Sequence, residues 1–205
     1  MSGVVDSVLS KLGPEQIAAI AARLGVDPAQ AQTAVEHAVP LIVGGMAQNA
    51  STPQGADALH DALGNHAGFD IGNVLANVLG GGGAGGGTSG AGIGGAILGH
   101  IFGGNRDAAN QGLGQVTGLG QQNADQLMAM LAPMVMAALA NHVQNRGIDP
   151  GMLGGMLGQQ SQQIQQNGGL VGGLLSAVLS HGGGNLDLSH LLQGAGGLLG
   201  AFGRR

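Results

Sequence analysis

The chain has 205 residues, of which 43% are hydrophobic and only 8% are charged, with a net charge of −5. It has no cysteine, which excludes disulfides, thiolate metal sites and cysteine nucleophiles. Nucleic acid is disfavoured as a partner, because the chain lacks both a basic face for phosphates and, with three Phe as its aromatic residues, surfaces for stacking bases.

The first helices are marked by clear start and stop signals. Valine and leucine residues over 4–12 are spaced along one face of a helix. Gly13 ends this helix, and Pro14 at a first helical position starts the next one, over 14–24. Gly25 then closes the second helix, so two consecutive amphipathic helices are predicted at the N-terminus.

Similar signals continue through the first third of the chain. Asp27 followed by proline starts a long helix over 28–49, with a kink expected at Pro40 inside it. A Thr-Pro start leads to a helix over 53–63, and a shorter helix is predicted over 70–79. No segment alternates apolar and polar residues as a strand does, so the predicted class is all-α.

Glycine interrupts this pattern in the middle of the chain. Residues 80–95 (GGGGAGGGTSGAGIGG) are of the kind that forms a flexible linker. Beyond it we expect a short apolar helix over 96–102, a polar helix over 105–117 and a long helix over 121–145 that carries Pro133.

The two long helices resemble each other. Selected positions between Leu24 and Gln48 correspond to positions between Thr117 and Asn141 at a constant offset of 93, including a proline inside each helix, Pro40 and Pro133. We therefore predict an internal duplication within a multihelical array. The expected organisation is an N-terminal helical half at 1–79, the linker at 80–95, a second half at 96–145 and a C-terminal helical extension at 146–205.

Glycines at a spacing of four characterise the extension. Such spacing lets helix backbones approach closely, and it predicts helix packing and self-association. The glycine pairs are Gly154 and Gly158, Gly168 and Gly172, Gly169 and Gly173, and Gly196 and Gly200.

Catalytic and metal-binding patterns are weak. Asp57, His60 and Asp61 share a helix face, with His66 nearby, a spacing that suits a divalent metal but that any polar helix surface also produces. The four methionines between Met128 and Met136 are interpreted as core residues and not as a copper site. Neither GxxxxGK[ST] nor GxSxG occurs, so we predict no catalytic residue, no metal ligand, no cofactor and no enzymatic activity.

Membrane association is also disfavoured. The longest apolar runs, over 127–140 and 170–179, are shorter than the roughly 20 residues that a spanning helix needs. The N-terminus lacks a basic start followed by an apolar run, as a secretory signal would have, so a cytoplasmic location is expected.

Several short motifs form one pattern over about 10–145. They are Leu12-Gly13-Pro14-Glu15-Gln16-Ile17, Leu24-Gly25-Val26, Leu59 with Ala62, Leu63 and His66, Ile97-Leu98-Gly99-His100-Ile101-Phe102-Gly103, Thr117-Gly118-Leu119 and Leu131-Ala132-Pro133-Met134-Val135-Met136. In these motifs the chain resembles the YidB-like bacterial family of unknown function, domain-of-unknown-function family nine hundred thirty-seven. The positions taken to match the family are Pro40, His66, Gly99, His100, Gly103, Gly118 and Pro133. The resemblance implies a multihelical all-α array, a bacterial cytoplasmic setting and no established activity.

The function that these observations favour is structural. Low charge, few aromatic residues and apolar stripes beyond residue 168 indicate a non-catalytic protein that associates with itself as a homo-oligomer or polymer. A cytoplasmic adaptor that docks on another protein or on a membrane surface is the alternative. A third hypothesis, a metal-binding protein or enzyme, rests on the region of His60 and His66.

Overall fold

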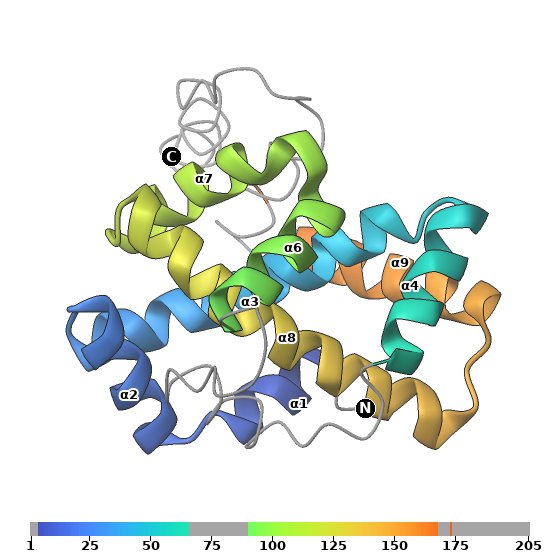
Figure 1. The fold of residues 1–205 in the computed structure, drawn as a ribbon, viewed down its shortest axis with the longest axis horizontal. Coiled ribbons are helices and arrows are strands. Elements are labelled where there is room, and N and C mark those ends of the chain that lie inside the picture. The colour runs from blue at the N-terminus through green and yellow to red at the C-terminus, as the bar shows by residue number, and fades with distance from the viewer. Residues whose placement is uncertain (1–3, 66–89, 168–172, 174–205) are drawn as a thin grey trace, which may run out of the picture.

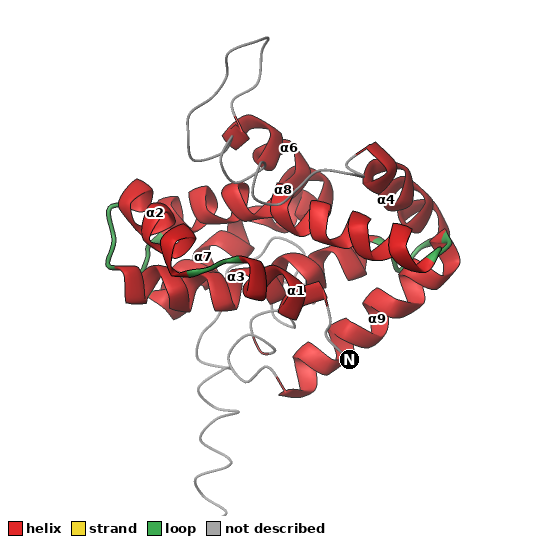
Figure 2. Cartoon of the chain, turned by 90° about the horizontal axis from the view of Figure 1, so that it is seen from below, coloured by secondary structure: helices red, strands yellow, loops and turns green. Residues whose placement is uncertain are grey.

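The structure is a computed structural model that describes residues 4–65, 90–167 and 173 (Figures 1 and 2). The described residues form helices joined by short turns, without a strand among them, which confirms the all-α class. The predicted helix over 70–79 lies outside these residues. The elements are α1 (Val4–Lys11), α2 (Pro14–Leu24), α3 (Pro28–Asn49), α4 (Pro53–Asn65), α6 (Gly90–Phe102), the 3-10 turn η1 (Gly103–Asn105), α7 (Arg106–Thr117), α8 (Gln121–Arg146) and α9 (Pro150–Asn167).

Helix α8 runs through the middle of the molecule (Figure 1). It contacts α1, α2, α3, α4, α6 and α7, and it is buried on nearly every side from Leu127 to Ala140. A helix that is apolar all round is typical of such a central position. The methionines of this helix are all at most 3% exposed, which confirms their interpretation as core residues: Met128, Met130, Met134 and Met136.

Within the described part of the chain, α8 is also the one helix long and apolar enough to cross a membrane. Its most apolar 18-residue stretch is 83% buried inside the protein. Burial of that kind also characterises the core helix of a protein that crosses no membrane.

The two long helices begin in comparable surroundings. Gly25 closes α2 in the left-handed conformation with φ 68°, and Gly118 closes α7 in the same way with φ 71°. Each is followed by a long helix, α3 or α8, which continues through its internal proline, Pro40 or Pro133. This order of elements agrees with an internal duplication, which stays a prediction.

The start of α6 differs from expectation. It begins at Gly90, so the last six residues of the predicted linker over 80–95 are helical, and the prediction was wrong there. The reason is tertiary: a Cβ added at Gly94 would fall on the carbonyl oxygen of Ala129, so glycine at this position lets α6 lie directly against the backbone of α8. Residues 80–89 lie outside the described part of the chain.

Helix α9, the first helix of the predicted extension, packs against α3 and α4. Leu153 and Leu157 are fully buried and belong to the same core as the residues of α8. The extension therefore contributes to the main core at least as far as this helix.

Candidate functional site

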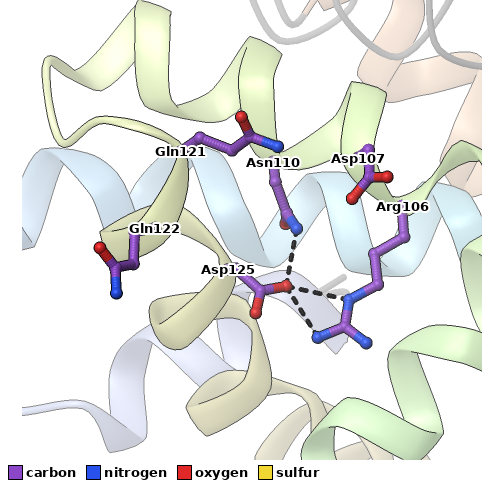
Figure 3. Close-up of a pocket in the computed structure, with 6 residues that line it drawn as sticks. All are labelled: Arg106, Asp107, Asn110, Gln121, Gln122 and Asp125. Atoms are coloured by element: carbon purple, nitrogen blue, oxygen red, sulfur yellow. Dashed lines mark hydrogen bonds and ion pairs between the residues drawn. The ribbon is translucent and has the colours of Figure 1, made fainter.

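A polar hollow of about 460 Å³ lies between α7 and α8 (Figure 3). Helical periodicity and motif spacing did not predict this hollow. The feature of the sequence that could have indicated this hollow is charge, because charged residues are scarce beyond residue 80 and three of them line the hollow. The residues that line it are Arg106, Asp107, Asn110, Gln121, Gln122 and Asp125.

One carboxylate oxygen organises this hollow. Oδ1 of Asp125 accepts from Nε of Arg106 at 2.9 Å, lies 2.8 Å from Nη2 of the same guanidinium, and accepts from Nδ2 of Asn110 at 2.6 Å. Nη1 of Arg106 donates to the carbonyl oxygen of Gly95 in α6 at 3.2 Å. The cluster therefore ties three helices together through charge-assisted hydrogen bonds.

Asn110 is the buried member of the cluster, at 2% exposure. Its Oδ1 has no hydrogen-bond partner among the described residues, and an unpaired buried acceptor costs about 1–3 kcal/mol. This oxygen is inaccessible, so it is not open to a ligand in the hollow. Arg106 and Asp125 are already bonded to each other, and the hollow's described lining offers no hydroxyl, thiol or imidazole. The hydrogen bonds and the ion pair of this cluster hold α6, α7 and α8 together.

The predicted histidine face lies on α4. Asp57 and Asp61 are exposed and His60 is half-buried, while His66 lies outside the described residues. Across residues 4–65 and 90–167, no group of three or more histidine or acidic side chains could hold a metal ion.

The motif around His100 forms the contact between α6 and the end of α3. Nδ2 of Asn49 donates to the backbone carbonyl oxygen of His100 at 3.1 Å. Gly45 of α3 meets the buried side chains of Ile101 and Phe102, since a Cβ there would be 2.7 Å from both. His100 is exposed, as are Gly99 and Gly103. Ile101, Phe102 and the backbone of His100 make this contact, while Gly99 and Gly103 have nothing within 4 Å of an added Cβ.

The predicted glycine pairs are described only in part. A Cβ at Gly154 would be 2.9 Å from the carbonyl oxygen of Ala50, so Gly154 packs within the chain, whereas Gly158 has open space beside it. Gly173 is helical. The other members of the set lie outside the described residues: Gly168, Gly169, Gly172, Gly196 and Gly200.

A second surface of interest is the α9 outer face, which we define as Gly151, Met152, Gly155 and Gly158. Met152 is 61% exposed and is the only large hydrophobic side chain so exposed among those the structure describes. Gly155, one turn further along, has nothing within 4 Å of an added Cβ. This face is apolar and carries no charged side chain.

The pKa of His142, near the end of α8, is lowered by burial and then by the nearby Arg146. A histidine whose pKa is lowered by folding stabilises the folded state at pH values above 6.5, its pKa in the unfolded chain. This stability is lost as the pH falls towards the pKa of the folded state, because the unfolded chain binds the proton first.

His142→Gln is expected to lose less stability than the wild type between pH 7.5 and pH 5.5, as measured by urea unfolding at each pH. The matched control is His100→Gln at an exposed position, and an unchanged pH dependence in His142→Gln would contradict the assignment.

Comparison with known proteins gives a family match. The family model described as a bacterial protein of unknown function (DUF937) matches residues 6–142. These residues run from α1 into the last turns of α8, so α9 lies beyond the match. No curated protein and no solved structure matches the chain.

Proposed function

The chain belongs to this bacterial family of unknown function, DUF937, and we propose that it is a non-catalytic protein that associates with itself through the glycine-spaced helices that begin with α9. The proposal assigns α9 two roles. Its inner side completes the core against α3 and α4, and its outer side meets a second copy.

The observation that carries the proposal is the exposure of Met152 on the α9 outer face. The other large hydrophobic side chains of the described chain are buried or partly buried, and every methionine of α8 is buried. Exposed apolar surface beside open glycines favours close contact with another helix, because no side chain holds the two backbones apart.

Charge also favours association. Residues 150–167 carry no charged side chain, and residues 80–205 contain four acids and four arginines. A surface with so little charge has little electrostatic repulsion against a second copy. The shortage of Lys and Arg on α9 disfavours an anionic membrane surface as the alternative partner.

The test is light scattering coupled to size exclusion over a concentration series of the full chain. The wild type is expected to exceed its monomer mass of 19.9 kDa increasingly with concentration. The double variant Met152→Glu and Gly155→Glu is expected to shift towards the monomer, because it places like charges on the α9 outer face of both copies. These positions are exposed, so the fold is expected to tolerate the changes.

The matched control places two glutamates on α7 at exposed positions, as Gln111→Glu and Gln115→Glu. It is expected to associate like the wild type. A wild-type chain that stays monomeric at every concentration contradicts self-association, and capture of a different protein by the α9 outer face then becomes the working hypothesis.

A further inference from the structure

A groove of about 320 Å³ lies where the end of α3, the start of α4 and the first turns of α9 meet. Small and apolar residues form most of its walls, and Gly151 and Gly155 of the α9 outer face belong to it. Its lining includes Ala50, Pro53, Ala56, Asp57, Gly151 and Gly155. Such walls admit a helix or an extended segment at close range.

One acidic residue lines the groove and a second lies close to it in the sequence. Asp57 lines it, and Asp61 follows one turn along α4, both exposed. Neither carboxylate forms an ion pair with the described residues, and no Lys or Arg is among the described lining residues. A partner for this groove should therefore combine an apolar stripe with positive charge.

The chain's own sequence contains such a segment. In residues 186–205 (LDLSHLLQGAGGLLGAFGRR), apolar residues recur at helical spacing from Leu188 to Phe202, and Arg204 and Arg205 follow directly. The eighteen residues from 168 to 185 separate it from α9. When extended, they reach about 60 Å, which is enough for a neighbouring molecule.

We propose that the groove of one copy binds residues 186–205 of a second copy, with the apolar stripe between α4 and α9 and the two arginines beside Asp57 and Asp61. This inference rests on the proposed self-association and names the two surfaces that meet. Each copy then has one groove and one segment, so the contact is head-to-tail and can extend into a chain of molecules or close into a ring.

The experiment reverses charge on each side separately in the full chain. Asp57→Lys with Asp61→Lys disables the groove, and Arg204→Glu with Arg205→Glu disables the segment. The affinity of each variant for further copies of itself is expected to fall at least about tenfold, because the two attractive charge pairs between groove and segment become repulsive. In a mixture of the two, each groove meets a segment of opposite charge on the other variant, so light scattering should find that association is restored although neither variant associates alone.

The chain that carries all four reversals restores opposite charges and is expected to assemble again. Glu15→Lys with Glu36→Lys, at exposed acids of the same N-terminal half, is the control and should associate like the wild type. If the wild type assembles but the reversals have no effect, or the mixture of the two variants does not associate, the groove is not the acceptor, while self-association itself stands.

Two other outcomes also overturn the inference. A wild type that is monomeric at every concentration removes the proposed function and the inference with it. If residues 186–205 of such a monomer become sensitive to protease only after Asp57→Lys and Asp61→Lys, the segment occupies the groove of its own chain.

Discussion

Replacement of Gly94 by alanine is expected to destabilise the protein by about 2 kcal/mol, even though alanine is the better helix former by about 1 kcal/mol. The new Cβ would fall on the carbonyl oxygen of Ala129, a backbone atom of the central helix α8 that cannot move aside as a side chain can. Helices α6 and α8 must then separate and lose contacts along their length. Urea unfolding measures the loss as a lower midpoint at an unchanged slope.

The same substitution at Gly99 supplies the control within α6. Gly99 is exposed and has nothing within 4 Å of an added Cβ, so Gly99→Ala should be neutral or stabilise the protein by up to about 1 kcal/mol. The two variants carry the same substitution, glycine to alanine, but they should change the free energy of unfolding in opposite directions. Equal effects would mean that α6 does not lie against α8 as the structure has it.

Truncation of Leu131 to alanine is expected to cost about 3–4 kcal/mol and to lower the melting temperature by about 10 °C. Leu131 is fully buried in the middle of α8, where helices from both halves of the chain surround it. No neighbouring backbone can collapse into the space without leaving contacts elsewhere. Thermal unfolding of the full chain, followed by circular dichroism, measures the change.

The control for this cavity is Met152→Ala, which removes a large apolar side chain that is 61% exposed. It should change stability by no more than about 0.5 kcal/mol. A small effect of Leu131→Ala, comparable with that of Met152→Ala, would contradict the central position of α8.

Helix starts were the most predictable part of this fold. Pro14, Pro28 and Pro53 each stand at the first position of a helix in the structure, as expected, and Pro150 does so as well. Proline marks a start locally, because it has no N–H and its φ is already helical. The carboxylate of Asp27 confirms the pattern by accepting from the backbone N–H of Ala29 at 2.8 Å.

The functions of the glycines were the least predictable. Gly94 reads as part of a linker in the sequence, yet it permits the closest approach between two core helices. Gly154 reads as a contact for another molecule, yet it packs against Ala50 within the chain. A glycine carries no side chain whose chemistry indicates a partner, so only the neighbouring helix decides its role.

The polar hollow between α7 and α8 was not predicted from the sequence for a related reason. Arg106 and Asp125 are 19 residues apart on different helices, and their contact depends on the angle at which α7 meets α8. The turn between these helices uses glycines with positive φ at 118 and 120, and Gly114 lies so close to it that a Cβ would be 2.6 Å from the backbone of Gly120. Helical periodicity contains no information about that angle.

The late position of α8 in the chain has a consequence for synthesis on the ribosome. Helices α1 to α4 all contact α8, which begins only at Gln121, so the helices made first have no complete core to join until most of the chain has been translated. Contacts of such long sequence separation form slowly and leave apolar faces uncovered in the meantime. The nascent N-terminal half should therefore be a client for chaperones that bind exposed apolar segments, and release should follow the emergence of α8 from the exit tunnel.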